Sequence, residues 1–295
     1  MADDEFSYLR DNASEVGLPW KGAPVVRRTS VSIGRGRELS ALLWGTAQAE
    51  FVLLHGGGQN AHTWDTVALA LDRPIVAIDL PGHGHSSWWD SGRYEVAEMA
   101  DAVAVAITTL AHDARAVVGM SLGAATAMAL TARHPTLVRR LALVDATPGG
   151  VGEGAAAIGA FIRGPESFES LEEILERTIA FNPTRTESSL RRGVIHNTRQ
   201  REDGRWVWRH HPGNEPGVQF PGIGEQQAWD DLSGIKLPIL LVLGGDSTVV
   251  RPENVEEFRR RQPDATVVTV AGAGHSVQGD KPLELAELIA KFVEA

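Results

Sequence analysis

Ser121 stands in the pentapeptide GMSLG, directly after an apolar run and directly before a stretch with helical character. This G-x-S-x-G pattern is typical of a serine nucleophile exposed on a sharp turn between a strand and a helix. The flanking Gly119 and Gly123 then have a steric role, because a Cβ there would clash with the adjacent strand and helix. Close packing of small residues explains Gly123 equally well, so the pentapeptide alone leaves both interpretations open.

A serine hydroxyl needs a base to take its proton at neutral pH. Of the ten histidines, His275 is the best candidate, because it lies between the last predicted strand and the last predicted helix. The glycine-rich sequence HGGGQN at residues 55–60 follows an apolar strand and can bring a backbone N–H to a substrate carbonyl. Gly57 and Leu122 are therefore predicted to be the two oxyanion donors. Phosphate binding is the weaker interpretation of this loop, because it matches neither G-K-S/T nor G-x-G-x-x-G.

Other histidines have structural interpretations. His83 and His85 form an H-x-H pair, but acidic residues with metal-site spacing are missing nearby, so loop structure is favoured over a metal site. His55 is expected to support its own loop. His210 and His211 are expected to be solvated.

The composition argues against several classes of protein. The net charge of -10, from 28 Lys and Arg against 38 Asp and Glu, opposes binding to nucleic acid or to an anionic membrane. The lack of cysteine excludes disulfides, thiolate nucleophiles and cysteine-ligated metals. The chain begins with acidic and polar residues, and no apolar run reaches membrane-spanning length. We therefore expect a cytoplasmic protein that is not inserted in a membrane.

The elements that must position these residues follow from hydrophobic patterning. Short apolar runs predict buried strands of a parallel sheet at 51–56, 74–80, 114–120, 140–146, 238–245 and 266–272. Two more polar strands, near 25–34 and 39–45, are predicted to form an antiparallel edge pair. Helices are predicted at 95–111, 122–134, 253–262 and 283–293. This alternation predicts an α/β fold, doubly wound around a mostly parallel sheet.

Residues 147–233 interrupt the alternation. They contain a glycine-rich stretch, a helix behind a capping box at 170–173 and a hairpin that turns at 203–204. We expect this segment to be a lid inserted between two strands of a core that is formed by 1–146 and 234–295. Its large apolar side chains are expected mainly to form the lid's own core, with pocket walls as the alternative: Phe161, Ile162, Phe168, Phe181, Trp206, Trp208 and Trp229.

Nearly the whole chain resembles the α/β-hydrolase superfamily of serine esterases. The motifs that carry the resemblance are HGGGQNAHTWD, DLPGHGHS, GMSLG and GHSVQGDKP, in the family's order. The stretch SLRRGVIHNTRQREDGRWVWR resembles small actinobacterial, mycobacterial-type carboxylesterases in particular. The resemblance implies a triad in the chain order Ser, acid, His.

The acid of this triad has two candidates. In many members of the superfamily it follows the strand that ends here at Gly244, in the pattern G-x-x-D-x-x-V; here Ser247 occupies the acid position and Asp246 comes one residue early. Some short-chain esterases instead take the acid from the end of the preceding strand and keep a serine at the later position. We therefore predict Asp145 as the acid and Ser247 as its hydrogen-bond partner. Asp246 stays the alternative.

The predicted function is that of a serine hydrolase that acts on a small carboxylic ester through an acyl-enzyme intermediate, with no cofactor and no metal. The triad does not distinguish this from a lactonase, perhydrolase, amidase or carbon–carbon bond hydrolase. A small-ligand binding protein of the same fold is an alternative of a different class. Dehalogenases and epoxide hydrolases are disfavoured, because they need an aspartate where Ser121 stands.

Overall fold

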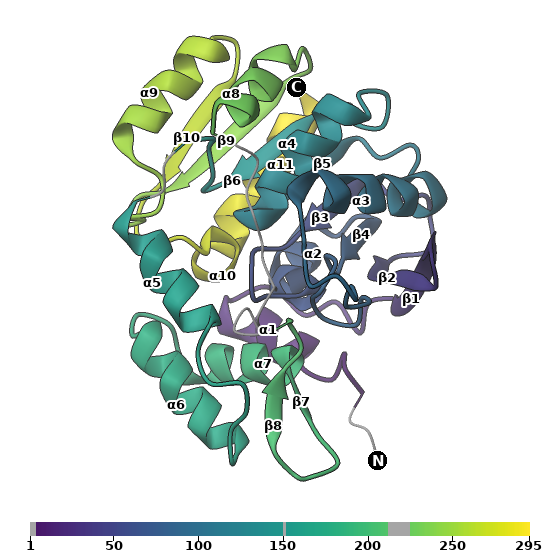
Figure 1. Ribbon diagram of the computed structural model, residues 1–295, viewed down its shortest axis with the longest axis vertical. Coiled ribbons are helices and arrows are strands. Elements are labelled where there is room, and N and C mark those ends of the chain that lie inside the picture. The colour runs from purple at the N-terminus through teal and green to yellow at the C-terminus, as the bar shows by residue number, and fades with distance from the viewer. Residues whose placement is uncertain (1–3, 150–151, 212–224) are drawn as a thin grey trace.

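A twisted eight-stranded sheet forms the centre of the computed structural model, which describes residues 4–149, 152–211 and 225–295 (Figure 1). The strand order is β1-β2-β4-β3-β5-β6-β9-β10. The strands are β1 (Val26–Gly34), β2 (Arg37–Trp44), β3 (Phe51–Leu54), β4 (Ile75–Ile78), β5 (Ala116–Met120), β6 (Leu141–Val144), β9 (Ile239–Gly244) and β10 (Thr266–Val270). β1 and β2 pair antiparallel at one edge, β2 pairs antiparallel with β4, and all other neighbours are parallel. The predicted doubly wound α/β fold is confirmed.

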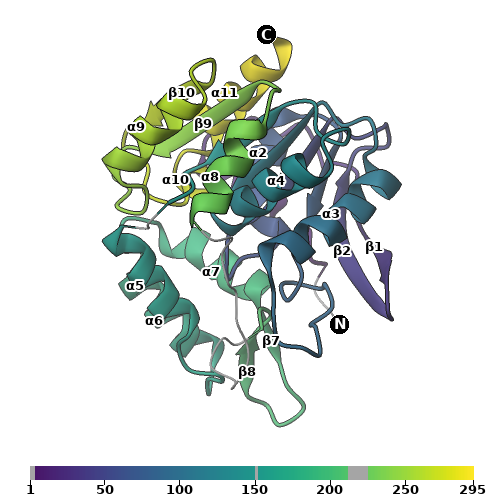
Figure 2. The same ribbon diagram turned by 45° about the horizontal axis from the view of Figure 1, so that its top comes forward.

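Helices cover both faces of the sheet, because the central strands are apolar on both sides (Figure 2). One face packs against α3 (Val96–Leu110), α4 (Leu122–Arg133), α8 (Glu225–Gly234) and α9 (Pro252–Arg261). The other packs against α1 (Leu9–Glu15), α2 (Asp65–Leu71), α10 (Val277–Asp280) and α11 (Pro282–Glu294). A short 3-10 helix, η1 (Ala61–Trp64), precedes α2. None of the helices in the described ranges is long and apolar enough to cross a membrane.

Between β6 and β9 the chain leaves the sheet and forms a separate small layer, seen below the sheet in both views. Its elements are α5 (Glu153–Ile162), α6 (Leu171–Phe181), α7 (Glu187–Asn197), β7 (Thr198–Gln200) and β8 (Trp206–Trp208). β7 and β8 form the antiparallel hairpin expected around the turn at 203–204. Phe168 and Trp208 lie in a hydrophobic cluster of this layer, with Phe161 and Trp206 packed against it. Trp229 instead packs into the main core through α8, so its expected place in the lid was wrong.

Candidate active site

Ser121 lies on the turn between β5 and α4, at the carboxyl end of the sheet. Its backbone has φ 52° and ψ -114°, although left-handed conformations are costly for a residue with a Cβ. Asp145, at the end of the neighbouring β6, also has a positive φ of 48°. Only four non-glycine residues in the described part of the chain have a positive φ, and two of the predicted triad residues are among them. Such strain is typical of active sites.

Close approach of backbones explains the glycines beside Ser121. A Cβ on Gly119 would lie 2.3 Å from the carbonyl oxygen of Gly123, and a Cβ on Gly123 would lie 2.3 Å from that of Leu54. The turn therefore presses α4 against β5 and against the end of β3. The glycines therefore serve both of the roles considered for them. They let α4 pack closely on the sheet, and this close packing forms the tight turn that carries Ser121.

Gly123→Ala is expected to lower the free energy of unfolding by about 1–3 kcal/mol, because the new methyl group must push the Leu54 carbonyl aside. Gly193→Ala is the matched control: this exposed position within α7 has nothing within 4 Å of a new Cβ, so the change should stabilise the protein by about 0.5–1 kcal/mol. Urea unfolding of both variants measures the difference. Equal or greater stability of Gly123→Ala would contradict the packing described here.

The predicted acid and base are in direct contact. Nδ1 of His275 lies 2.7 Å from Oδ2 of Asp145, which is fully buried. Ser247 donates its hydroxyl proton to the same Oδ2, and the backbone N–H of Gly244 donates to Oδ1 at 2.9 Å. Three donors thus surround one buried carboxylate, which can hold the His275 ring with its Nδ1 protonated and its Nε2 free as a base.

Neither Asp246 nor Ser121 takes part in the hydrogen bonds around Asp145 and His275. Asp246, the alternative acid, has an exposed side chain, and its backbone N–H donates to the carbonyl of Ala273 at 2.9 Å. No hydrogen bond joins Ser121 Oγ to His275 among the described residues; such bonds are often long without substrate and tighten when it binds.

The glycine-rich loop lies beside Ser121. A Cβ on Gly56 would lie 2.5 Å from the sulfur of Met120 and 3.4 Å from Cβ of Ser121. Within the described ranges, the backbone N–H groups of Gly57 and Leu122 donate to no protein acceptor, and both residues are partly exposed. Free N–H donors beside a nucleophile are what an oxyanion hole requires.

Two buried histidines hold this loop in place. Nε2 of His55 accepts the N–H of Leu80 at 2.9 Å, and its Nδ1 donates to the carbonyl of Gly56 at 2.8 Å. Nε2 of His83 accepts the N–H of Gly58 at 3.1 Å, and its Nδ1 donates to the carbonyl of Pro81 at 3.0 Å. Burial lowers the pKa of both rings, so both stay neutral. The loop roles expected for these two histidines agree with these bonds.

His210 and His211 are buried, with 5% and 7% exposure, so the expectation that they are solvated was wrong. Nε2 of His210 lies 3.4 Å from the carbonyl oxygen of Ile162, and the backbone N–H of His211 donates to the carbonyl of Gly82 at 2.7 Å. The sequence gives no sign that these two histidines are buried, because they are polar and the residues around them show no hydrophobic periodicity. The contacts show that the hairpin's end docks onto the loop that contains His83.

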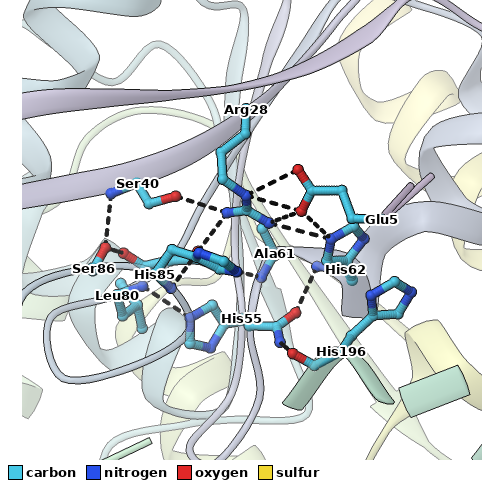
Figure 3. Close-up of polar contacts among 12 residues, drawn as sticks. Glu5, Arg28, Ser40, His55, Ala61, His62, Leu80, His85, Ser86 and His196 are labelled. Carbon is cyan, nitrogen blue, oxygen red and sulfur yellow. Dashed lines mark hydrogen bonds and ion pairs between the residues drawn. The ribbon is translucent and has the colours of Figure 1, made fainter. Parts of the chain in front are cut away.

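A partly buried charge network supports the far end of the glycine-rich loop (Figure 3). Asp79 accepts the N–H of Ala61 at 2.7 Å and an N–H of Arg28 at 2.8 Å. Arg28 also donates to Glu5 at 2.7 Å and 2.9 Å. Burial alone would raise the pKa of Glu5, but bonds from His62 and Arg28 outweigh it and lower the pKa to about 2. Sequence reasoning missed this network, because its members are 23 and 51 positions apart and form no motif.

One group of side chains has metal-ligating types. The ligand atoms of His62, Asp65 and His196 lie within 4.8 Å of one another. However, Nδ1 of His62 is 2.9 Å from Asp65, and its Nε2 is 3.2 Å from Glu5. The rings of His62 and His196 are stacked, 3.8 Å apart and 11° from parallel, so their in-plane lone pairs do not converge on one ion. This geometry fits a charge network better than a metal centre.

The network predicts a pH dependence of stability. Burial would lower the pKa of His62, but Asp65 and Glu5 outweigh it and raise the pKa from 6.5 to about 9. The stability that His62 contributes is therefore complete below pH 6.5 and lost as the pH rises through about 9. The difference in urea midpoint between the wild-type protein and His62→Gln should shrink over this range. A difference that stays constant from pH 6 to pH 10 would show that His62 is not charged in the folded protein.

Known proteins share this architecture. A model of the alpha/beta hydrolase family matches residues 51–288. The esterase Rv0045c of Mycobacterium tuberculosis is 41% identical over 293 residues, which cover 97% of this chain and 94% of that protein. The sn-1-specific diacylglycerol lipase ABHD11 of Mus musculus is 30% identical over 257 residues, covering 82% of this chain and 80% of that protein. The crystal structure of Rv0045c superposes with a TM-score of 0.86 at 40% identity, covering 100% of this chain and 99% of that one.

Proposed function

The chain belongs to the alpha/beta hydrolase family and is an ester hydrolase, and from that premise we propose that Ser121, His275 and Asp145 are its catalytic triad. The contact of 2.7 Å between buried Asp145 and His275 carries the proposal, because it leaves the other ring nitrogen free to act as a base. The exposed side chain of Asp246 argues against the alternative acid. Ser247 is proposed to support Asp145.

The reaction follows from these positions. Oγ of Ser121 attacks the ester carbonyl carbon while His275 takes the hydroxyl proton. The N–H groups of Gly57 and Leu122 stabilise the negative charge that develops on the carbonyl oxygen. Asp145 stabilises the resulting imidazolium, which then gives its proton to the departing alkoxide. A water molecule, deprotonated by His275, attacks the acyl-enzyme and releases the carboxylic acid. The net change consumes one ester and one water and yields one alcohol and one acid.

We propose that the substrate is a small carboxylic ester and that residues 147–233 act as a lid over the site. The lid role is supported by Ile162, which packs against the glycine-rich loop, and by the docking of His211 on Gly82. Within this segment α8 packs into the main core, so α5, α6, α7 and the β7–β8 hairpin are the described elements that we propose to cover the site.

A fluorophosphonate label, combined with a panel of p-nitrophenyl esters of increasing acyl length, tests the proposal. We expect one adduct, on the peptide that contains Ser121, and turnover of esters. A folded protein that neither labels at Ser121 nor hydrolyses any ester of the panel would overturn the proposed site and favour a small-ligand binding protein instead.

A further inference from the structure

α5 crosses from the acid side of the proposed site to the oxyanion loop. At its start, the N–H groups of Gly152 and Gly154 donate to the carbonyls of Val249 and Thr248, at 2.8 Å and 3.3 Å. These acceptors directly follow Ser247, the partner of Asp145. The helix has ten residues, which span about 15 Å. That length is enough to bridge an active site from one side to the other.

The last residue of α5, Ile162, lies against the oxyanion loop. A Cβ added to Gly57 would lie 3.6 Å from Cδ1 of Ile162. A Cβ added to Gly58 would lie 3.0 Å from Cγ1 of Ile162. Ile162, Gly57 and Gly58 are all partly exposed. The Ile162 side chain is therefore partly accessible beside the glycines that are proposed to hold the oxyanion.

Neighbouring contacts hold the end of α5 in this position. The carbonyl oxygen of Ile162 lies 3.4 Å from Nε2 of His210. The preceding residue, Phe161, stacks on Phe181 with ring centroids 4.4 Å apart, and its carbonyl accepts an N–H of Arg177 at 3.1 Å. Because the end of α5 is fixed in this way, it presents Ile162 as a rigid wall rather than as an adaptable surface.

The chemistry of the triad decides which part of the substrate meets this wall. Because His275 protonates the departing alkoxide, the alcohol part of an ester must lie beside His275, and the acyl chain points away from it. Gln59 marks the His275 side of the loop, since its amide is 3.5 Å from Ser276 Oγ. Gly58, bonded to His83 and in contact with Ile162, marks the other side. Ile162 thus faces the acyl side.

We propose that Ile162 is a specificity-determining residue that limits the size of the acyl group, an inference that rests on the proposed acyl-enzyme at Ser121. Ile162→Ala removes three carbons from the wall and makes room for a longer acyl chain. Each methylene of the acyl chain that is buried in this additional space should raise kcat/KM about fourfold. Ile162→Phe fills the same space and should restrict the enzyme to shorter acyl groups.

The experiment compares two substrate series on the wild-type protein and the variants. For p-nitrophenyl esters of increasing acyl length, Ile162→Ala should raise the octanoate-to-butyrate ratio of kcat/KM about tenfold or more, and Ile162→Phe should lower it. For acetate esters of increasing alcohol length, the ratios should change less than twofold. Val105→Ala removes an exposed apolar side chain from α3 and is the control that should leave both series unchanged.

Each result has one meaning. An unchanged acyl profile in both Ile162 variants, with Ser121 still labelled by fluorophosphonate, would overturn the role of Ile162 and leave the proposed function standing. A change confined to the alcohol series would overturn the acyl assignment. Absence of labelling and turnover in the wild-type protein would instead contradict the proposed function itself. If Ile162→Ala is poorly folded, Ile162→Val and Ile162→Phe test the same trend in opposite directions.

Discussion

Replacement of Ser121 by alanine is expected to lower kcat for esters by about 10⁵-fold or more, because the proposed acyl-enzyme forms on the Ser121 hydroxyl. Steady-state kinetics with p-nitrophenyl esters measures the loss. Fluorophosphonate labelling should disappear in the same variant.

The fold should survive this change. Serine and alanine both carry a Cβ, so the cost of the positive φ at position 121 is the same for both residues. The melting temperature of Ser121→Ala should therefore stay close to that of the wild-type protein. A Ser121→Ala variant that keeps full activity would show that the nucleophile lies elsewhere.

Asp145→Asn should lower kcat by about 10⁴-fold, the second largest effect. The carboxylate accepts from Nδ1 of His275 at 2.7 Å, from Ser247 and from the Gly244 N–H. An amide in its place cannot carry the negative charge that stabilises the imidazolium, and it can hold His275 in the wrong tautomer. Substrate KM should change much less than kcat, since Asp145 is buried and does not touch substrate.

Asp246→Asn is the matched control for this prediction. It makes the same chemical change on an exposed side chain one residue before Ser247, so kcat should stay within about twofold of the wild-type value. The opposite pattern, with a large loss in Asp246→Asn and a small one in Asp145→Asn, would make Asp246 the acid.

Most of the sheet could be predicted from the sequence, because its central strands are buried on both faces and therefore appear as short apolar runs. The strand predicted to be buried at 266–272 is instead the edge strand β10, in which only Val270 is buried. The run at 116–120 and the helix that ends at Arg133, before Pro135, match the structure within two residues of their predicted bounds. The contact between Asp145 and His275 was predicted from the resemblance to short-chain esterases that take their acid from the end of this strand.

Hydrophobic patterning did not predict the contacts between segments that are distant in the sequence. The 3-10 helix and α2 at 61–71 were not predicted, although their apolar residues pack in the core. The burial of His210 and the bond between Glu5 and Arg28 depend on tertiary packing between distant segments. Local propensity carries no information about such pairs, because the partner is chosen by the fold rather than by neighbouring residues.

The pairing of β6 with β9 has an evolutionary consequence. Because β6 and β9 are parallel neighbours, the intervening segment leaves the sheet at the carboxyl end of β6 and returns to it at the amino end of β9. The entropy of closing such a loop grows only with the logarithm of its length, by about 0.6 kcal/mol for each doubling. Segments of quite different length can therefore replace one another here at little cost in folding free energy. Under the proposed lid role, inherited changes in this single stretch would alter which substrates are accepted, while the sheet keeps Ser121 and Asp145 in place.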